Sequence, residues 1–226
     1  FSCSDEFSEK RTNVFFKKQS PLFSGNSDFI FYYGHKFINE ALVMTIFVKD
    51  LISKKSGKAS SDLLTRPVGK KYYQSAEKKI SSAMKGEVVI LDFSDIKVID
   101  PSFADEFVIN IVKLSHSKDF YVRLRNLTKS AQSNISAIID SYTDFAKKDY
   151  AVAVEDLLDN GTHFLGNIGL QEKEIAEFLR INKTASTKAI SDNFSFTESK
   201  TATCLKTLEQ LRIVRTDETG KYFSVL

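Results

Sequence analysis

The chain has 226 residues, of which 42% are hydrophobic and 27% charged, and its net charge is +3. This balance is that of a globular protein, and it excludes disordered, fibrous and disulfide-stapled chains. So small a net charge does not by itself indicate a nucleic-acid partner. The longest apolar run, residues 41–48, is far shorter than the roughly 20 residues of a membrane-spanning helix. We therefore expect that the protein does not contact a membrane. The two cysteines form no CxxC pair, which favours a reduced, cytoplasmic setting.

Residues 1–43 are interpreted as an N-terminal extension, in which 1–28 have no regular hydrophobic period and 29–33 are an apolar stretch typical of a strand before a turn at Gly34. Beyond them, apolar strands alternate with amphipathic helices, which predicts an α/β domain over 44–147. The run 88–91 is continuously apolar, as expected of a central strand with helices on both faces of a mixed or parallel sheet. The expected strands are 44–52, 86–93 and 120–126, and a helix is expected after each of them.

Residues 148–166 predict a β-hairpin, because an apolar strand is followed by Asn160-Gly161, two residues that tolerate positive φ. We interpret this hairpin as a connector to a second domain at 167–226. In that domain the pattern predicts three helices followed by two short strands around a tip at 217–220. The expected helices are 172–180, 186–194 and 197–211.

The stretch GEVVILDFSDIKVIDPSFADEFV, residues 86–108, joins an apolar strand ending in LDF to a helix that opens with SFADE. In this arrangement it resembles the STAS-like family of uncharacterised bacterial domains, which is related to the anti-sigma factor antagonists. Thr65-Arg66 before one helix and RLRN at 123–126 before another extend the likeness over 44–147. The resemblance implies an α/β fold with a STAS-like mixed sheet and helices, used as a regulatory switch.

Ser102 matches the position at which the anti-sigma factor antagonists carry a serine that a kinase-like partner phosphorylates. The resemblance thus implies a phospho-switch or partner-binding site at Ser102. The neighbours depart from the antagonists, because Pro101 precedes the serine and bulky Phe103 follows it. The residues alone predict a plainer role, with Ser102 as the N-cap of a helix and Asp105 as its capping-box partner. Both interpretations stay open at this point.

The segment AISDNFSFTESKTATCLKTLEQLRIVR, residues 189–215, resembles the winged helix-turn-helix of bacterial transcription regulators. The likeness implies a short turn, a recognition helix over 197–211 and then a wing. At helical spacing, the packed side of that helix consists of Thr201, Cys204, Leu205 and Leu208. The outward residues, together with two cations that flank the wing, are the candidate DNA-binding residues: Ser199, Lys200, Ala202, Thr203, Lys206, Arg215 and Lys221.

Charge argues against a strong DNA binder. Residues 167–226 carry nine lysines and arginines against eight acidic residues, a net charge of +1. Glu198, Asp217 and Glu218 lie near the expected positions of phosphates, and each would weaken binding by repulsion. Because winged helices also act as protein-interaction or dimerisation modules, a protein-only role for this part stays open.

Motifs of enzyme active sites are missing from the sequence. The phosphate-binding and dinucleotide-binding patterns GxxxxGK[ST] and GxGxxG, the nucleophile elbow GxSxG and the zinc motif HExxH do not occur. The three histidines are isolated, and Asp92 and Asp100 are interpreted as strand-end and turn residues rather than as a catalytic carboxylate pair. We therefore expect no enzymatic activity, no metal and no cofactor.

The hypothesis that follows is a bacterial regulator of transcription, in which a STAS-like switch module is coupled to a winged helix that binds double-stranded DNA. The alternative is a protein-only adaptor, whose STAS-like domain binds an ATPase of the histidine-kinase type or another anti-sigma-like partner. A homodimer is compatible with either hypothesis. The two differ in one measurable property, which is binding to duplex DNA.

Overall fold

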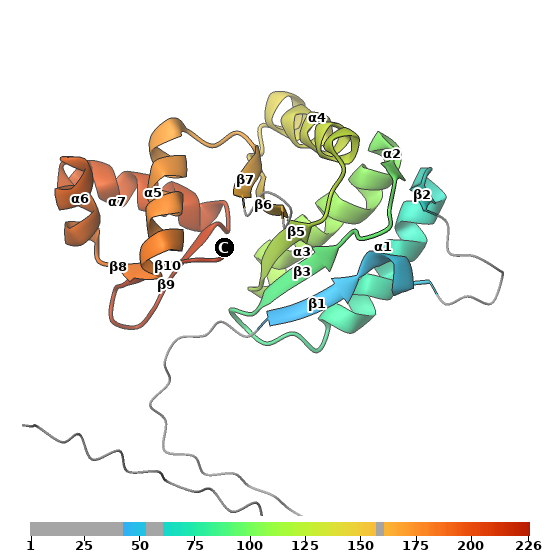
Figure 1. Cartoon of the computed structure of the whole chain (residues 1–226), viewed down its shortest axis with the longest axis horizontal. Helices are drawn as coiled ribbons and strands as arrows, with labels where there is room; N and C mark the ends of the chain where they lie inside the picture. The colour runs from blue at the N-terminus through green and yellow to red at the C-terminus, as the bar shows by residue number, and fades with distance from the viewer. Residues whose placement is uncertain (1–42, 53–60, 157–160) are drawn as a thin grey trace, which may run out of the picture. The chain divides into compact units, whose positions relative to one another are not determined.

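The computed structural model describes residues 43–52, 61–156 and 161–226 (Figure 1). Its largest element is a five-stranded sheet in the order β1-β3-β5-β6-β7. The first four of these strands are parallel, and β7 is antiparallel to β6. This sheet with its helices confirms the predicted mixed α/β class. The strands are β1 (Val43–Phe47), β3 (Val88–Asp92), β5 (Tyr121–Arg125), β6 (Ala151–Asp156) and β7 (Gly161–Gly166). Apart from Val43, the expected N-terminal extension lies outside the described residues.

The hairpin expected at 148–166 is present, but it is part of the sheet and not a connector. β6 pairs in parallel with β5, placing Val154 opposite Leu124, and β7 adds the last, antiparallel strand. Residues 151–154 are all buried, so the hairpin extends the core begun by the earlier strands. A local hairpin signal predicts only a turn between two strands. It does not indicate with which other strand the hairpin will pair. The sheet therefore continues to Gly166 instead of ending at 147.

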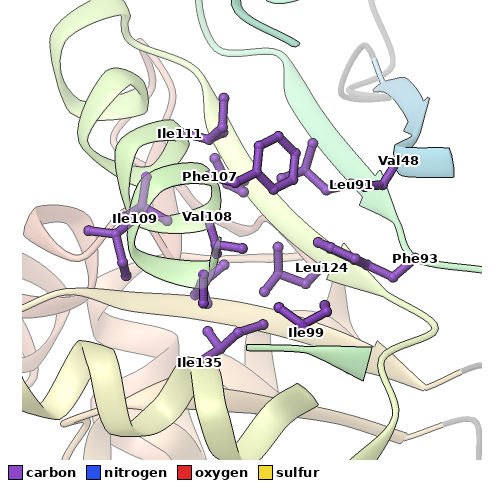
Figure 2. Close-up of a cluster of buried hydrophobic side chains, with 14 of the residues drawn as sticks. Val48, Leu91, Phe93, Ile99, Phe107, Val108, Ile109, Ile111, Leu124 and Ile135 are labelled. Atoms are coloured by element: carbon purple, nitrogen blue, oxygen red, sulfur yellow. The ribbon is translucent and has the colours of Figure 1, made fainter. Parts of the chain in front are cut away.

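Helices cover one face of this sheet. A rod made of α2 (Pro101–Ala104), the π-helical η2 (Asp105–Ile109) and α3 (Asn110–Lys118) contacts both α1 (Arg66–Ile80) and α4 (Lys129–Ala146). Alternate strand residues such as Leu91 and Leu124 point into this layer and pack among Phe107 and Ile135 (Figure 2). Across the described parts of the chain, no helix combines the length and the hydrophobicity needed to cross a bilayer. The smaller elements here are η1 (Val48–Asp50) and the parallel pair β2 (Asp62–Leu63) and β4 (Val98–Ile99).

The C-terminal part contains the three expected helices, and between the first two it has a short strand that the sequence pattern missed. Its small sheet has the order β8-β10-β9 and is antiparallel throughout. One apolar cluster holds the three helices together, with Ile175, Ile190 and Leu205 fully buried. In chain order the elements are α5 (Leu170–Asn182), β8 (Thr184–Ala185), α6 (Thr187–Phe194), α7 (Glu198–Gln210), β9 (Val214–Thr216) and β10 (Tyr222–Ser224).

The face of β3 opposite the helices is covered by the end of the chain. Val88 and Ile90 point away from the helical layer and are buried together with Tyr121 of β5 and Val225. The guanidinium of Arg123 donates a hydrogen bond to the Val225 carbonyl. The apolar strand is therefore buried on both faces, as predicted, but helices supply only one of the two covers.

Candidate functional sites

The corner between β4 and α2 is organised by Asp100 and not by Ser102. Asp100 is the N-cap of α2, and its Oδ1 accepts a hydrogen bond from the backbone N–H of Phe103 at 2.6 Å. The same oxygen accepts from Ser102 Oγ at 2.9 Å, and Oδ2 accepts from the backbone N–H of Thr65 at 2.8 Å. The expectation that Ser102 caps the helix is therefore wrong. Asp is as good an N-cap as Ser, and Pro101 fits the first helical position, so the helix begins two residues earlier.

Asp105, the expected capping-box partner of Ser102, instead ties three helices together. Its carboxylate accepts hydrogen bonds from Tyr142 of α4 at 2.8 Å and from the guanidinium of Arg66 at 2.7 Å. Arg66 opens α1 and also reaches Glu106 at 3.1 Å. The SFADE and Thr65-Arg66 motifs thus meet in space and fix α1 on the rod of α2, η2 and α3.

Electrostatics keep the Asp100 carboxyl ionised. Burial opposes ionisation, but the hydrogen bonds from Thr65, Phe103 and Ser102 outweigh burial and lower the pKa of Asp100 below its ordinary value. Thr65 itself has a φ of +71°, which a β-branched residue adopts only at a cost. The bond from its N–H to Asp100 holds that conformation in place. Ser102 is half-buried, so a phosphate on its hydroxyl would lie beside an anion.

A second polar network at the carboxyl ends of β3 and β5 was not predicted. Asp92, only 4% exposed, accepts hydrogen bonds from Ser94 Oγ at 2.5 Å and from Asn126 Nδ2 at 3.0 Å. Burial opposes the shift, yet these bonds lower the pKa of Asp92 below its ordinary value. The LDFS and RLRN motifs carry these residues, and the positive φ of Asn126, +59°, is the kind of position at which Asn is favoured.

Asp92 and Asp100 serve separate structural networks, in agreement with their interpretation as strand-end and turn residues. Within the part of the chain that the structure describes, no group of three or more His, Cys, Asp or Glu side chains could hold a metal ion. Two of the histidines have identified neighbours: His163 is hydrogen-bonded to Gln132 at 2.9 Å, and His116 lies edge-on against Tyr150. His35 lies outside the described residues.

One face of α7 is exposed over its whole length. The residues expected to pack, Thr201, Cys204, Leu205 and Leu208, are buried. All five residues that the sequence places outward on this helix are exposed: Ser199, Lys200, Ala202, Thr203 and Lys206. Thr197 is the N-cap of α7 and accepts a hydrogen bond from the backbone N–H of Lys200 at 3.3 Å. The Lys200 ammonium lies 4.5 Å from the centre of the Phe196 ring, which anchors its side chain at the start of the helix.

The hairpin of β9 and β10 carries the two other candidate residues. Arg215 is half-buried and its guanidinium lies 5.5 Å from the centre of the Phe223 ring, directly across the strand pair. Lys221 is exposed. At the tip, the Asp217 carboxylate accepts hydrogen bonds from the backbone N–H groups of Thr219 and Lys221. Asp217 therefore builds the turn, while its negative charge stays close to the two cations.

Comparison with known protein families gives a match in the α/β part of the chain. The model of a STAS-like domain of unknown function matches residues 72–129. The matched stretch runs from within α1 through β3, the rod and β5 to the first residue of α4. It includes Asp92 with its partners Ser94 and Asn126, and Asp100 with Ser102 and Phe103, but not Thr65. No curated protein matches the chain. The chain therefore contains a STAS-like domain at residues 72–129, which supply the strands β3 and β5 and the rod of α2, η2 and α3.

Proposed function

We propose that the protein is a non-enzymatic regulator in which the STAS-like domain is coupled to a C-terminal winged helix-turn-helix that binds duplex DNA. The observation that carries this proposal is the two-sided character of α7. Its apolar side is buried in the C-terminal core, and on its other side two lysines and two hydroxyl-bearing residues are exposed. Side chains of this kind can contact phosphates and base edges.

The order of elements supports the same assignment. Helix, strand, helix, helix and β-hairpin follow one another from α5 to β10, which is the order of a winged helix. Residues 195–197 join α6 to α7, a connection as short as that between the helices of a helix-turn-helix. In that arrangement the second of the two helices enters the major groove and the hairpin lies over the adjacent backbone.

The small number of cations on this surface limits its affinity for DNA. Lys200, Lys206, Arg215 and Lys221 are the cations available on α7 and the hairpin, and Glu198 and Glu218 are exposed near them. With four phosphate contacts at most, binding would weaken with salt at a log-log slope of about −0.9 for each contact. We therefore propose modest affinity for nonspecific duplex, with sequence-dependent contacts from Ser199 and Thr203.

The experiment is a fluorescence-anisotropy titration of the full chain with a mixed pool of labelled genomic duplexes at several salt concentrations. Lys200→Ala should flatten the log-log slope by about one contact. Lys173→Ala is the matched control, because Lys173 is an exposed lysine on α5, outside the proposed surface. An unchanged slope in Lys200→Ala would misplace the interface. Absence of duplex binding at low salt would remove the proposal and favour the protein-only adaptor.

A further inference from the structure

A hollow of about 320 Å³ lies where α3, the segment leading into β6 and the end of α7 meet. It is within the size range of small-molecule sites. Tyr150 lines the hollow and is itself buried, with 9% of its surface exposed. Gln210, the last residue of α7, is the lining residue that comes from the C-terminal part. The lining residues are Lys113, His116, Lys148, Asp149, Tyr150 and Gln210.

The cations of the hollow outnumber its one acid. Lys113 and Lys148 are positive, Asp149 is negative, and burial together with the nearby Arg212 charge lowers the pKa of His116, which favours the neutral ring. Lys113 Nζ donates to Tyr142 Oη at 3.0 Å and lies 4.2 Å from the centre of the Tyr142 ring. These contacts hold the Lys113 ammonium in place, and the bond to Tyr142 uses one of its three N–H donors.

The same end of α7 is fastened to α3. Arg212, two residues beyond Gln210, donates to Asp119 Oδ1 at 2.6 Å and to the Ser115 carbonyl at 3.0 Å. Its guanidinium also lies 5.1 Å from the centre of the Tyr121 ring. Ser115 and His116 are neighbours on α3, so one turn of this helix both lines the hollow and receives Arg212. Gln210 therefore lines the hollow only while α7 is docked in this way.

We propose that this hollow binds the phosphate or carboxylate group of a small molecule through Lys113 and Lys148. A ligand that contacts α3 and Gln210 together stabilises the docked arrangement of α7, because it binds that arrangement and not an undocked one. The hollow would then be the point at which a small anion controls α7. This regulatory consequence rests on the proposed DNA binding, whereas the anion site itself does not.

The first test is binding without DNA. Inorganic phosphate and succinate are each titrated, at constant pH and ionic strength, into the full chain while the His116 ring resonances are followed by NMR. We expect a saturable shift with at least one of them, and Lys148→Gln should weaken that anion about tenfold, as expected for the loss of a charge-assisted hydrogen bond. Lys147→Gln is the matched control, because Lys147 is the adjacent exposed lysine and its Nζ donates to the Asp144 carbonyl instead.

The outcomes separate the ligand classes and the two proposals. Saturation by phosphate alone assigns a phosphate ligand, and saturation by succinate alone assigns a dicarboxylate. No saturable shift with either anion, or equal weakening by Lys147→Gln and Lys148→Gln, would overturn the site. When the anion binds, amide hydrogen exchange of residues 212–226 should slow, and unchanged exchange would overturn the link to α7. Since neither readout uses DNA, failure of duplex binding leaves both results standing.

Discussion

At the scale of single residues, Asp100 has the structural role that local sequence reasoning gives to Ser102. It caps α2 through Phe103, holds Thr65 and accepts the Ser102 hydroxyl. Asp100→Ala should therefore lower the free energy of unfolding by about 1–3 kcal/mol, because it removes a cap and leaves the Thr65 N–H without its acceptor. Ser102→Ala, which removes only a donor to Asp100, should cost about 1 kcal/mol or less. Urea denaturation of both variants measures the difference, and a larger loss in Ser102→Ala would contradict this assignment.

A negative charge at position 102 should be tolerated less well than a methyl group. Ser102→Asp places a carboxylate beside the ionised Asp100, where Ser102 Oγ now donates, so repulsion replaces a hydrogen bond. We expect Ser102→Asp to be less stable than Ser102→Ala by thermal denaturation, with the gap narrowing as salt increases. A more stable Ser102→Asp would indicate that the helix N-terminus dominates over Asp100. If Ser102 is a regulatory site, Ser102→Asp should also change partner binding in a pull-down, whereas a purely structural serine leaves it unchanged.

The two aspartate networks also predict how stability depends on pH. The pKa values of Asp92 and Asp100 are lower than the ordinary 3.8, so the unfolded chain takes up protons on these groups before the folded chain does. Their contribution is complete above that ordinary value and is lost as pH falls through the lowered values. We expect unfolding free energy to fall below about pH 4. Asp100→Asn, which keeps an oxygen acceptor, should flatten that decline. An equally steep decline in the variant would contradict the role of Asp100.

Some of these residues could be predicted and others could not. The buried and exposed sides of α7 follow from helical periodicity alone. The sequence therefore correctly placed Lys200 on the exposed side and Leu205 on the buried side. The bond between Asp92 and Asn126 joins residues 34 positions apart and depends on the parallel pairing of β3 with β5. No local pattern encodes that register. The prediction that Ser102 is the N-cap was wrong for a different reason. Asp100 and Ser102 are both good N-cap residues within three positions, and only the backbone conformation decides between them.

At the scale of elements, α1 packs closely on the rod at Gly69. A Cβ atom there would lie 2.8 Å from Glu106 Cβ and 3.0 Å from the Phe103 carbonyl oxygen. Helix propensity alone predicts that Gly69→Ala stabilises α1 by about 1 kcal/mol. We expect the opposite, a loss of about 1–3 kcal/mol, because the rod must move. Lys71→Ala, at an exposed site on the same helix, is the control and should be nearly neutral in urea denaturation. Stabilisation by Gly69→Ala would contradict the observed packing.

The elements themselves were largely predictable, whereas their partners were not. Periodicity located the strands and helices, and the two antiparallel strands expected within 148–166 are present. Asn160 lies outside the described residues, and Gly161 is already the first residue of β7. Neither periodicity nor the hairpin signal indicated that β6 pairs with β5 or that β7 completes the sheet. The strand β8 was missed because it has only two residues, too few for a period to appear.

At the scale of the whole molecule, two hydrogen bonds link the C-terminal part to the rest of the chain across about a hundred residues. Arg212 donates to Asp119 at the end of α3, and Arg123 of β5 donates to the Val225 carbonyl. Arg212→Gln should raise amide hydrogen exchange in residues 222–226 by roughly tenfold, since bonds to a charged group are lost. Arg180→Gln is the matched control, because Arg180 pairs with Glu177 within α5 and not across the junction. Equal exchange in the two variants would show that Arg212 does not fasten the C-terminal part.

The proposed function requires that the exposed face of α7 and the hairpin of β9 and β10 contact duplex DNA. Amide chemical-shift mapping of the isotope-labelled full chain with a duplex at low salt tests it most directly. We expect the largest shifts at Ser199, Lys200, Thr203, Lys206 and Lys221, and no shifts at Lys173 or residues 100–106. Shifts confined to the STAS-like domain, or no shifts in excess duplex, would contradict it.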